Sequence, residues 1–190
     1  QKSRTEYSVM NTTVAFAAQA TAILMGFFTR VVFTRMLSEG YVGINGLFTD
    51  ILNILSLSEL GVGTAITYAL YGPIARNDIK KQQILMRMFR TFYRITAGVV
   101  LIAGLCLIPF LDILMKDRPD VDHLIIIYLL YLLNSFVSYL LIYKKILVDA
   151  HQMNYITVMY HNGFLVLQDI CQIIVLLLTR NFILFLIVAV

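Results

Sequence analysis

The sequence predicts an all-α polytopic membrane protein, and its composition is the first reason. Hydrophobic residues make up 59% of the 190 residues and charged residues only 14%, against roughly 45–50% and about 25% in a soluble domain. A soluble domain of this size needs a more polar surface, and a disordered chain contains fewer apolar residues. The two cysteines, Cys106 and Cys171, each lie inside an apolar run, which excludes a disulfide scaffold.

The length of the apolar runs is the second reason. Five runs can each cross a hydrocarbon core of about 30 Å as a helix, and the two-residue period of membrane strands is absent. The complete spans are predicted at about 9–33, 44–70, 89–115, 124–143 and 155–179, and a truncated sixth at 182–190. Because the chain opens with Gln1 and stops inside an apolar run, we expect residues 1–190 to be the N-terminal transmembrane bundle of a longer protein.

The first span carries one face of small and polar residues. Its members recur every three or four positions and are Thr12, Ala15, Gln19, Ala22, Gly26 and Arg30. An arginine at this depth costs at least about 2.5–3.5 kcal/mol unless it is paired or reaches the surface. Two interpretations of Arg30 therefore stay open: snorkelling or structural pairing, and an anion-facing role in a cavity.

The second span carries the most polar stripe. The residues that share its face are Asn45, Thr49, Asn53, Ser56, Gly63 and Thr67. At 100° per residue, Glu59 lies about 40° from Asn45, at the edge of this stripe. A carboxylate within a span indicates a functional site by default: Glu59 could bind a proton or cation, pair with Arg30, or do both. Gly61 and Gly63 allow close packing or local unwinding.

Residues 72–94 form the one sizeable polar stretch, predicted to be a basic amphipathic cytoplasmic segment. We expect Pro73 to end the second span and Asn77-Asp78 to cap a helix that leads into the third. The basic residues that recur every seven positions on one face are Lys80, Arg87 and Arg94. They could anchor the segment to anionic lipid of the inner leaflet, at about 1 kcal/mol per charge, or capture a phosphorylated lipid head group.

The third span is predicted to be mainly scaffold, with Pro109 able to kink its outer end. The fourth is more polar and carries Tyr128, Tyr131, Asn134, Ser135, Ser138 and Tyr139. Tyrosines on such a face can stack on sugars, or they can be packing residues whose hydroxyl is satisfied.

The fifth span has polar residues on one face, namely Thr157, His161, Gln168 and Gln172, with Asp169 beside them. His161 and Asp169 could form part of a proton relay. The alternative is interhelical hydrogen bonding, worth about 0.6–2 kcal/mol for each bond.

The distribution of charge predicts the orientation of the chain. Short connections make consecutive spans alternate in direction, and ten of the 15 Lys and Arg residues then fall at one set of ends. The positive-inside rule places that side, and with it the N-terminus, in the cytoplasm. We attribute the net charge of +4 to this orientation rather than to nucleic acid. The sequence contains no zinc-ligand spacing, phosphate loop or nucleophile elbow, so we expect no enzyme, cofactor or metal.

Several blocks resemble a known family. The blocks are Tyr41–Leu52 with Leu55–Ile66, Ala69–Asp78, and Ser138-Tyr139 followed by Tyr143–Lys145, Gln152 and Tyr155. In order and spacing they are similar to polysaccharide-export flippases of the Wzx type, in the MOP superfamily. The chain departs from the family pattern at Gly72, where lysine is usual, and at His151, where aspartate is usual.

This resemblance implies the N-terminal bundle of an exporter with two pseudo-symmetric bundles in the bacterial plasma membrane. The implied function is flipping of an undecaprenyl-pyrophosphate-linked oligosaccharide by alternating access, for surface polysaccharide biosynthesis. Arg30 would then face the pyrophosphate or acidic sugars. The residues expected to contact substrate beside it are Asn53, Tyr131 and Asn134. Glu59 and Asp169 would couple transport to H⁺ or Na⁺.

Two alternatives remain. A MATE-like cation-coupled exporter of small molecules shares the superfamily, although the positive charge of Arg30 disfavours cationic substrates in a low-dielectric cavity. A membrane-embedded glycan-processing enzyme would need a large outer loop with catalytic groups, and the outer loops visible in this sequence are short.

Overall fold

The computed structural model describes residues 4–56, 62–115, 121, 123–151 and 153–189. Within these ranges the chain is helical and contains no strand, in agreement with the all-α prediction. The elements in chain order are α1 (Arg4–Met36), α2 (Glu39–Ser56), α3 (Val62–Ala75), α4 (Ile79–Leu107), the 3₁₀ turn η2 (Ile108–Phe110), α5 (Leu111–Leu114), α6 (Leu124–Ala150), α7 (Asn154–Thr179) and α8 (Phe182–Ala189).

Four helices of the described chain are long and apolar enough to cross a membrane. They are Thr12–Met36, Ile79–Phe110, Leu124–Ala150 and Ile156–Thr179. These ranges contain or overlap the first, third, fourth and fifth predicted spans. The chain is therefore a multi-pass helical membrane protein.

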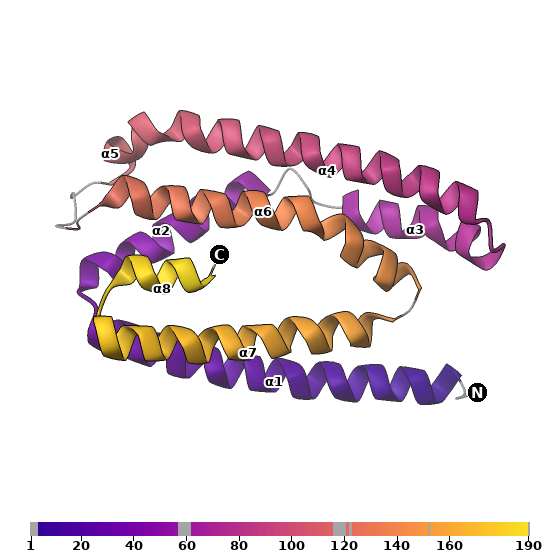
Figure 1. Ribbon diagram of the computed structural model, residues 1–190, viewed down its shortest axis with the longest axis horizontal. Helices are drawn as coiled ribbons and strands as arrows, with labels where there is room; N and C mark the ends of the chain where they lie inside the picture. The colour runs from indigo at the N-terminus through magenta and orange to yellow at the C-terminus, as the bar shows by residue number, and fades with distance from the viewer. Residues whose placement is uncertain (1–3, 57–61, 116–120, 122, 152, 190) are drawn as a thin grey trace.

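The second predicted span, 44–70, includes parts of α2 and α3. The structure has two helices there, α2 and α3, on either side of residues 57–61, which lie outside the described residues. Neither is among the four spanning helices. The two follow each other from one end of the molecule toward the other (Figure 1).

Pro73 was expected to end the second span, and this expectation is wrong. Pro73 lies inside α3, which continues to Ala75. Proline restricts the residue before it and removes one N–H donor, whereas the residues after it can stay helical. The backbone N–H of Asp78 then donates to the Pro73 carbonyl at 2.9 Å and closes the turn into α4.

The helices form two groups, with two further helices between them (Figure 1). α1 packs along α7, whereas α3 and α4 pack along α6. Figure 1 shows α2 and α8 between the groups at one end of the molecule. The α3–α4 turn and the α6–α7 connection lie at the end where the chain begins, and the α1–α2 and α7–α8 connections lie at the opposite end (Figure 1). The expected alternation of direction is thus present.

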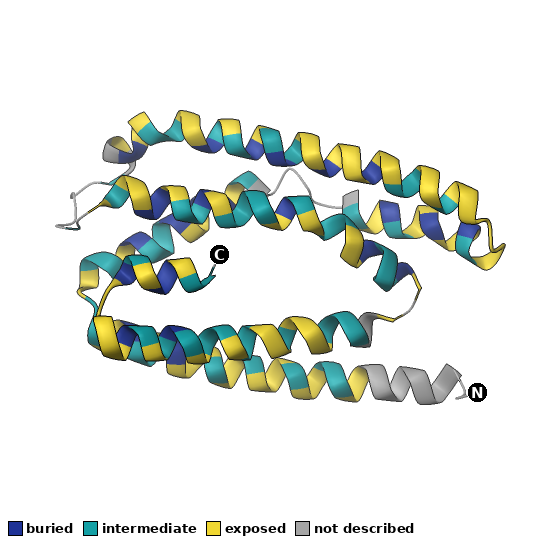
Figure 2. Ribbon diagram, in the orientation of Figure 1, coloured by how far each residue is buried: buried dark blue, intermediate teal, exposed yellow. Residues whose placement is uncertain are grey.

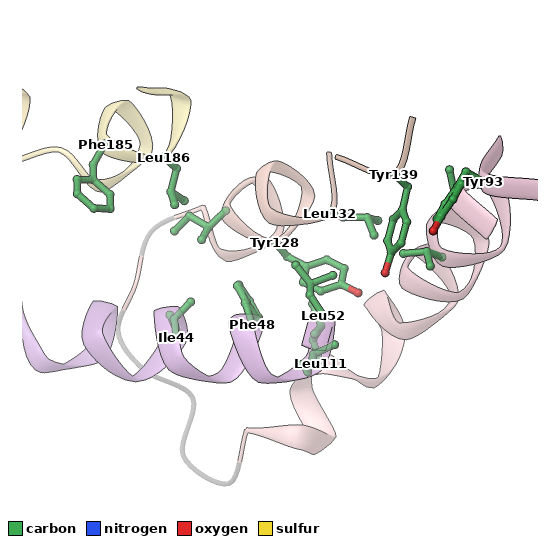
Figure 3. Packing of buried hydrophobic residues seen from close by; sticks show 14 of the residues in the cluster. Ile44, Phe48, Leu52, Tyr93, Leu111, Tyr128, Leu132, Tyr139, Phe185 and Leu186 are labelled. Carbon is green, nitrogen blue, oxygen red and sulfur yellow. The ribbon is translucent and has the colours of Figure 1, made fainter. Parts of the chain in front are cut away.

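The core lies where α2, α4 and α6 meet. Figure 3 shows Phe48 and Leu52 of α2 facing Tyr128 of α6, and the rings of Phe48 and Tyr128 are 5.1 Å apart. Outward faces are exposed over most of their length (Figure 2), and they carry large apolar side chains such as Phe16 and Leu178. An apolar surface of this extent fits contact with lipid.

Small residues line the face of α1 that packs on α7. Ala15, Ala18 and Ala22 are half-buried and Thr29 is buried, at the three- and four-residue spacing of one helical face. Small side chains let two membrane helices approach closely, which is how such helices gain van der Waals contact. Part of the small-and-polar stripe predicted on the first span therefore serves packing.

An aromatic cluster joins α8 to α1 and α2. The ring of Phe33 lies 5.5 Å from that of Phe182 and 5.3 Å from that of Phe185, and Tyr41 of α2 is 5.2 Å from Phe182. Aromatic pairs at this separation contribute about 0.5–1.5 kcal/mol beyond their buried area. The cluster therefore holds α8 against α1 and α2.

Candidate functional site

A cavity of about 170 Å³ lies between α2, α6, α7 and α8. It is lined by Asn45, Leu130, Tyr131, Asn134, Gln172, Phe185, Leu186 and Ala189. Half of these side chains are polar, and they come from three different helices. The cavity is partly open to the outside, and its volume leaves room for one small polar unit.

Asn45 and Tyr131 are joined directly across the cavity wall. The Tyr131 hydroxyl donates a hydrogen bond to Oδ1 of Asn45, and this bond links α2 to α6 over 86 residues of sequence. The Tyr131 ring also packs against Phe48, with the ring centroids 5.8 Å apart. Because the bond uses only the oxygen of the amide, the Asn45 amide N–H groups can still donate to a ligand.

Gln172 forms the opposite side of the cavity. Its side chain is buried, and its Nε2 donates to the main-chain carbonyl of Phe185 at 3.2 Å. This hydrogen bond connects α7 to α8. A buried amide without a partner would cost about 1–3 kcal/mol, so the bond explains how Gln172 is accommodated in the interior.

Arg30, on α1, is not among the residues that line the cavity. Its guanidinium carbon is 5.7 Å from the centroid of the Phe33 ring. The side chain is exposed, and no carboxylate of the described chain lies within 4 Å of it. The predicted alternative of a structural salt bridge therefore has no support among the described residues, and the pairing with Glu59 lies outside them.

The residues predicted to contact substrate divide into two sets. Tyr131 and Asn134 line the cavity, whereas Arg30 does not. Asn53 is exposed on α2 and is not among the lining residues. It lies about two turns beyond Asn45 on the same polar stripe of α2. Of these two asparagines, only Asn45 lines the cavity.

Asp169, predicted to couple ions or protons, lies at the α1–α7 contact instead of in the cavity lining. Its Oδ1 accepts a hydrogen bond from the Thr29 hydroxyl at 3.0 Å. Thr29 is buried and Asp169 is half-buried. The other residue predicted for coupling, Glu59, lies outside the described residues.

The basic segment predicted over 72–94 is divided between two helices. α3 ends at Ala75, and Asp78 caps α4 by accepting a hydrogen bond from the Lys81 main-chain N–H at 3.0 Å. The predicted N-cap is thus present. The three cations assigned to the membrane surface, Lys80, Arg87 and Arg94, are all exposed on α4.

Sequence reasoning placed Asn45 and Gln172 on polar stripes without assigning them to a site. The stripe on each helix was visible in the sequence, but periodicity along one helix does not say which polar residues of different helices meet. Asn45 meets Tyr131 across 86 positions. The polar and aromatic lining is thus a property of the assembled helices.

The chain matches no protein-family model, no curated protein and no solved structure.

Proposed function

We propose that this chain forms part of a flippase that moves a lipid-linked oligosaccharide, carried on undecaprenyl pyrophosphate, across the bacterial plasma membrane by alternating access. The observation that carries the proposal is the cavity in which Asn45, Tyr131, Asn134 and Gln172 converge inside a helical membrane protein. Polar residues inside membrane bundles mark substrate and ion pathways.

The chemistry of the cavity suits a sugar next to an anion. Amide and phenol groups supply both donors and acceptors for hydroxyl groups, and an aromatic ring offers a face for an apolar sugar surface. The guanidinium of Arg30, which is exposed on α1, is suited to bidentate binding of phosphate or carboxylate. The four polar lining residues and Arg30 would therefore bind the sugar nearest the pyrophosphate.

The proposed cycle requires the helix groups to move. A cavity of about 170 Å³ is smaller than the roughly 300–1,000 Å³ of ordinary ligand pockets, so it holds a single unit and not an oligosaccharide. α1 with α7 would rock against α3, α4 and α6, as helix groups do in alternating access. The cavity seen here would then be the narrow state of the pathway.

A complementation experiment tests the proposal. The full-length protein is expressed in a strain that lacks its own flippase, with Arg30→Ala as the test variant and Arg35→Ala, on the same helix, as the matched control. We expect surface polysaccharide to be restored by the unmodified protein and by Arg35→Ala, but to fall at least about tenfold with Arg30→Ala, the loss of one strong charge-assisted contact. Failure of the unmodified protein to restore polysaccharide would remove the proposal.

The same strains separate the flippase from a MATE-like exporter. An exporter of cationic small molecules predicts raised resistance to such compounds and no change in surface glycans. We expect the opposite pattern, because the positive charge of Arg30 would disfavour a cationic substrate. The inhibitory concentration of a cationic dye, measured beside surface polysaccharide, distinguishes the two.

A further inference from the structure

The cavity between α2, α6, α7 and α8 combines a polar half with an apolar half. The polar side chains are Asn45, Tyr131, Asn134 and Gln172, and the apolar ones are Leu130, Phe185, Leu186 and Ala189. No charged side chain is among these described lining residues. Burying a phosphate or carboxylate without a compensating charge is costly, so the cavity suits a neutral group that is polar at one end and apolar at the other.

The orientation of Gln172 leaves an acceptor for a ligand. The main-chain carbonyl of Phe185 can only accept, so the amide atom that faces it at 3.2 Å is the nitrogen Nε2. The Gln172 side chain is only 5% exposed, and no donor of the described chain bonds its oxygen, Oε1. A buried amide oxygen without a partner is costly. An N–H group of a ligand in the cavity would satisfy it.

Asn45 presents the opposite polarity. Its Oδ1 accepts the hydrogen bond from the Tyr131 hydroxyl, so its nitrogen, Nδ2, keeps both N–H donors. No acceptor of the described chain takes up these donors. Asn45 lies on α2 and Gln172 on α7, and both line the cavity. The lining therefore offers N–H donors from one helix and a carbonyl acceptor from another.

The apolar half of the lining restricts the ligand further. Phe185 and Leu186 are 9% and 5% exposed, and Figure 3 shows both side chains on the side of α8 that faces α2. A sugar hydroxyl group can bond the amides, but it leaves this apolar surface uncovered. An acetamido group fits both halves, because its carbonyl accepts, its N–H donates and its methyl group is apolar. It is also small enough for a cavity of about 170 Å³.

We propose that the cavity binds the acetamido group of an N-acetylated amino sugar. Nδ2 of Asn45 donates to the acetamido carbonyl, Oε1 of Gln172 accepts from the acetamido N–H, and the methyl group packs against Leu186. The inference rests on the proposed function for the presence of a sugar, and it narrows the substrate to an oligosaccharide that carries an N-acetylated unit. The pyrophosphate then lies outside the cavity, because no charged residue is among the described lining.

Binding of small probes to the purified full-length protein tests the proposal. Methyl N-acetylglucosaminide and methyl glucoside differ only in the acetamido group, and N-methylacetamide carries the amide without a sugar. Dissociation constants and ligand contacts are measured in detergent micelles by saturation-transfer NMR. The test variant, Asn45→Asp, keeps an acceptor for Tyr131 but, as a carboxylate, has no N–H donor. Asn162→Asp is the matched control, because Asn162 is half-buried on α7 but is not among the lining residues.

We expect the N-acetylglucosaminide to bind at least about tenfold more tightly than the glucoside, because it gains two hydrogen bonds and a buried methyl group. The strongest saturation should fall on the acetamido methyl protons. Asn45→Asp should reduce the preference to less than about threefold, and Asn162→Asp should keep it. The comparison of the two sugars uses the unmodified protein, so it decides the proposal even if Asn45→Asp does not fold.

Equal binding of the two sugars, or no binding of the N-acetylglucosaminide, would overturn the proposal, as would a full preference in a folded Asn45→Asp protein. N-Methylacetamide that binds as tightly as the sugar would assign the cavity to a main-chain amide and would also overturn it. The complementation experiment fails separately. Restored polysaccharide without a preference for the acetamido sugar would remove this proposal alone, whereas a preference without restored polysaccharide would remove only the flippase.

Discussion

At the scale of single residues, Gly104 sets the distance between α4 and α6. A Cβ atom at this position would lie 3.0 Å from Cδ2 of Leu132 and closer still to Cδ1. The Gly104 carbonyl accepts a hydrogen bond from the buried Tyr128 hydroxyl at 2.8 Å. The absence of a side chain therefore allows both the close packing of Leu132 and a hydrogen bond between the two helices.

We predict that Gly104→Ala destabilises the protein, although alanine is the better helix former. Overpacking against Leu132 should cost about 1–3 kcal/mol and outweigh the gain of roughly 0.5–1 kcal/mol from replacing a helical glycine. Gly98→Ala on the same helix is the matched control, because a Cβ there meets nothing within 4 Å. Thermal unfolding in detergent micelles measures both, and a Gly104→Ala protein as stable as Gly98→Ala would contradict the packing argument.

The candidate site illustrates what residue patterns can predict. The spacing of polar residues placed Tyr131 and Asn134 on a polar face of the fourth span, and both line the cavity. The partners did not follow, because the bonds of Tyr131 to Asn45 and of Gln172 to Phe185 depend on how whole helices pack. Asn53, on the same stripe as Asn45, was assigned the same role but does not line the cavity.

At the scale of helices, the contact between α1 and α7 joins small side chains with one polar link. The Thr29 hydroxyl donates to Asp169 at 3.0 Å, within an interface where Ala15, Ala18 and Ala22 are half-buried. The small residues allow close approach, and the hydrogen bond satisfies one oxygen of a carboxylate that would otherwise be costly in the membrane.

We predict that Thr29→Val weakens the α1–α7 contact by about 0.6–2 kcal/mol, the usual range for a hydrogen bond between membrane helices. Thr21→Val is the control, because the Thr21 hydroxyl bonds only the Ala17 carbonyl of its own helix. Asp169→Asn keeps an acceptor oxygen for Thr29 and should retain most of the stability. Denaturant unfolding in micelles measures the three variants, and equal losses for both threonine variants would argue against the link.

The helices that could be predicted are those with long uninterrupted apolar runs. The spans assigned at 9–33, 89–115, 124–143 and 155–179 all overlap spanning helices. The second span was predicted as one helix because its apolar run is long enough, and the structure describes α2 and α3 within it, on either side of residues 57–61. Gly61 and Gly63 marked this region as one of possible unwinding, but composition alone cannot choose between unwinding and close packing.

At the scale of the whole molecule, the ends of the helices fall into two sets. The α6–α7 connection lies at the end where the chain begins, and the α1–α2 connection lies at the other (Figure 1). The end where the chain begins carries more Lys and Arg residues than the other end. By the positive-inside rule, this end is predicted to face the cytoplasm. Alternation of direction is therefore visible in the fold, and the assignment of each end to a compartment is a prediction.

We predict opposite labelling of the two ends in intact cells. His151→Cys, in the α6–α7 connection, and Ser38→Cys, between α1 and α2, are introduced separately into a protein whose Cys106 and Cys171 are replaced by alanine; residues 38 and 151 are both exposed. A membrane-impermeant maleimide should label Ser38→Cys directly and His151→Cys only after permeabilisation. The reverse pattern would invert the orientation, and labelling of both in intact cells would contradict the alternation of spans.

The hydrogen bond from Gln172 to the main chain of Phe185 holds α8 against α7. The stacking of Phe33 against Phe182 and Phe185 binds α8 to α1 as well. In the proposed transport cycle, α8 would then move with the α1–α7 pair, and the contact of Tyr41 with Phe182 would have to open. The two moving parts would then separate at the boundary between α8 and α6. A ligand in the cavity would contact one wall that stays in place and one that moves.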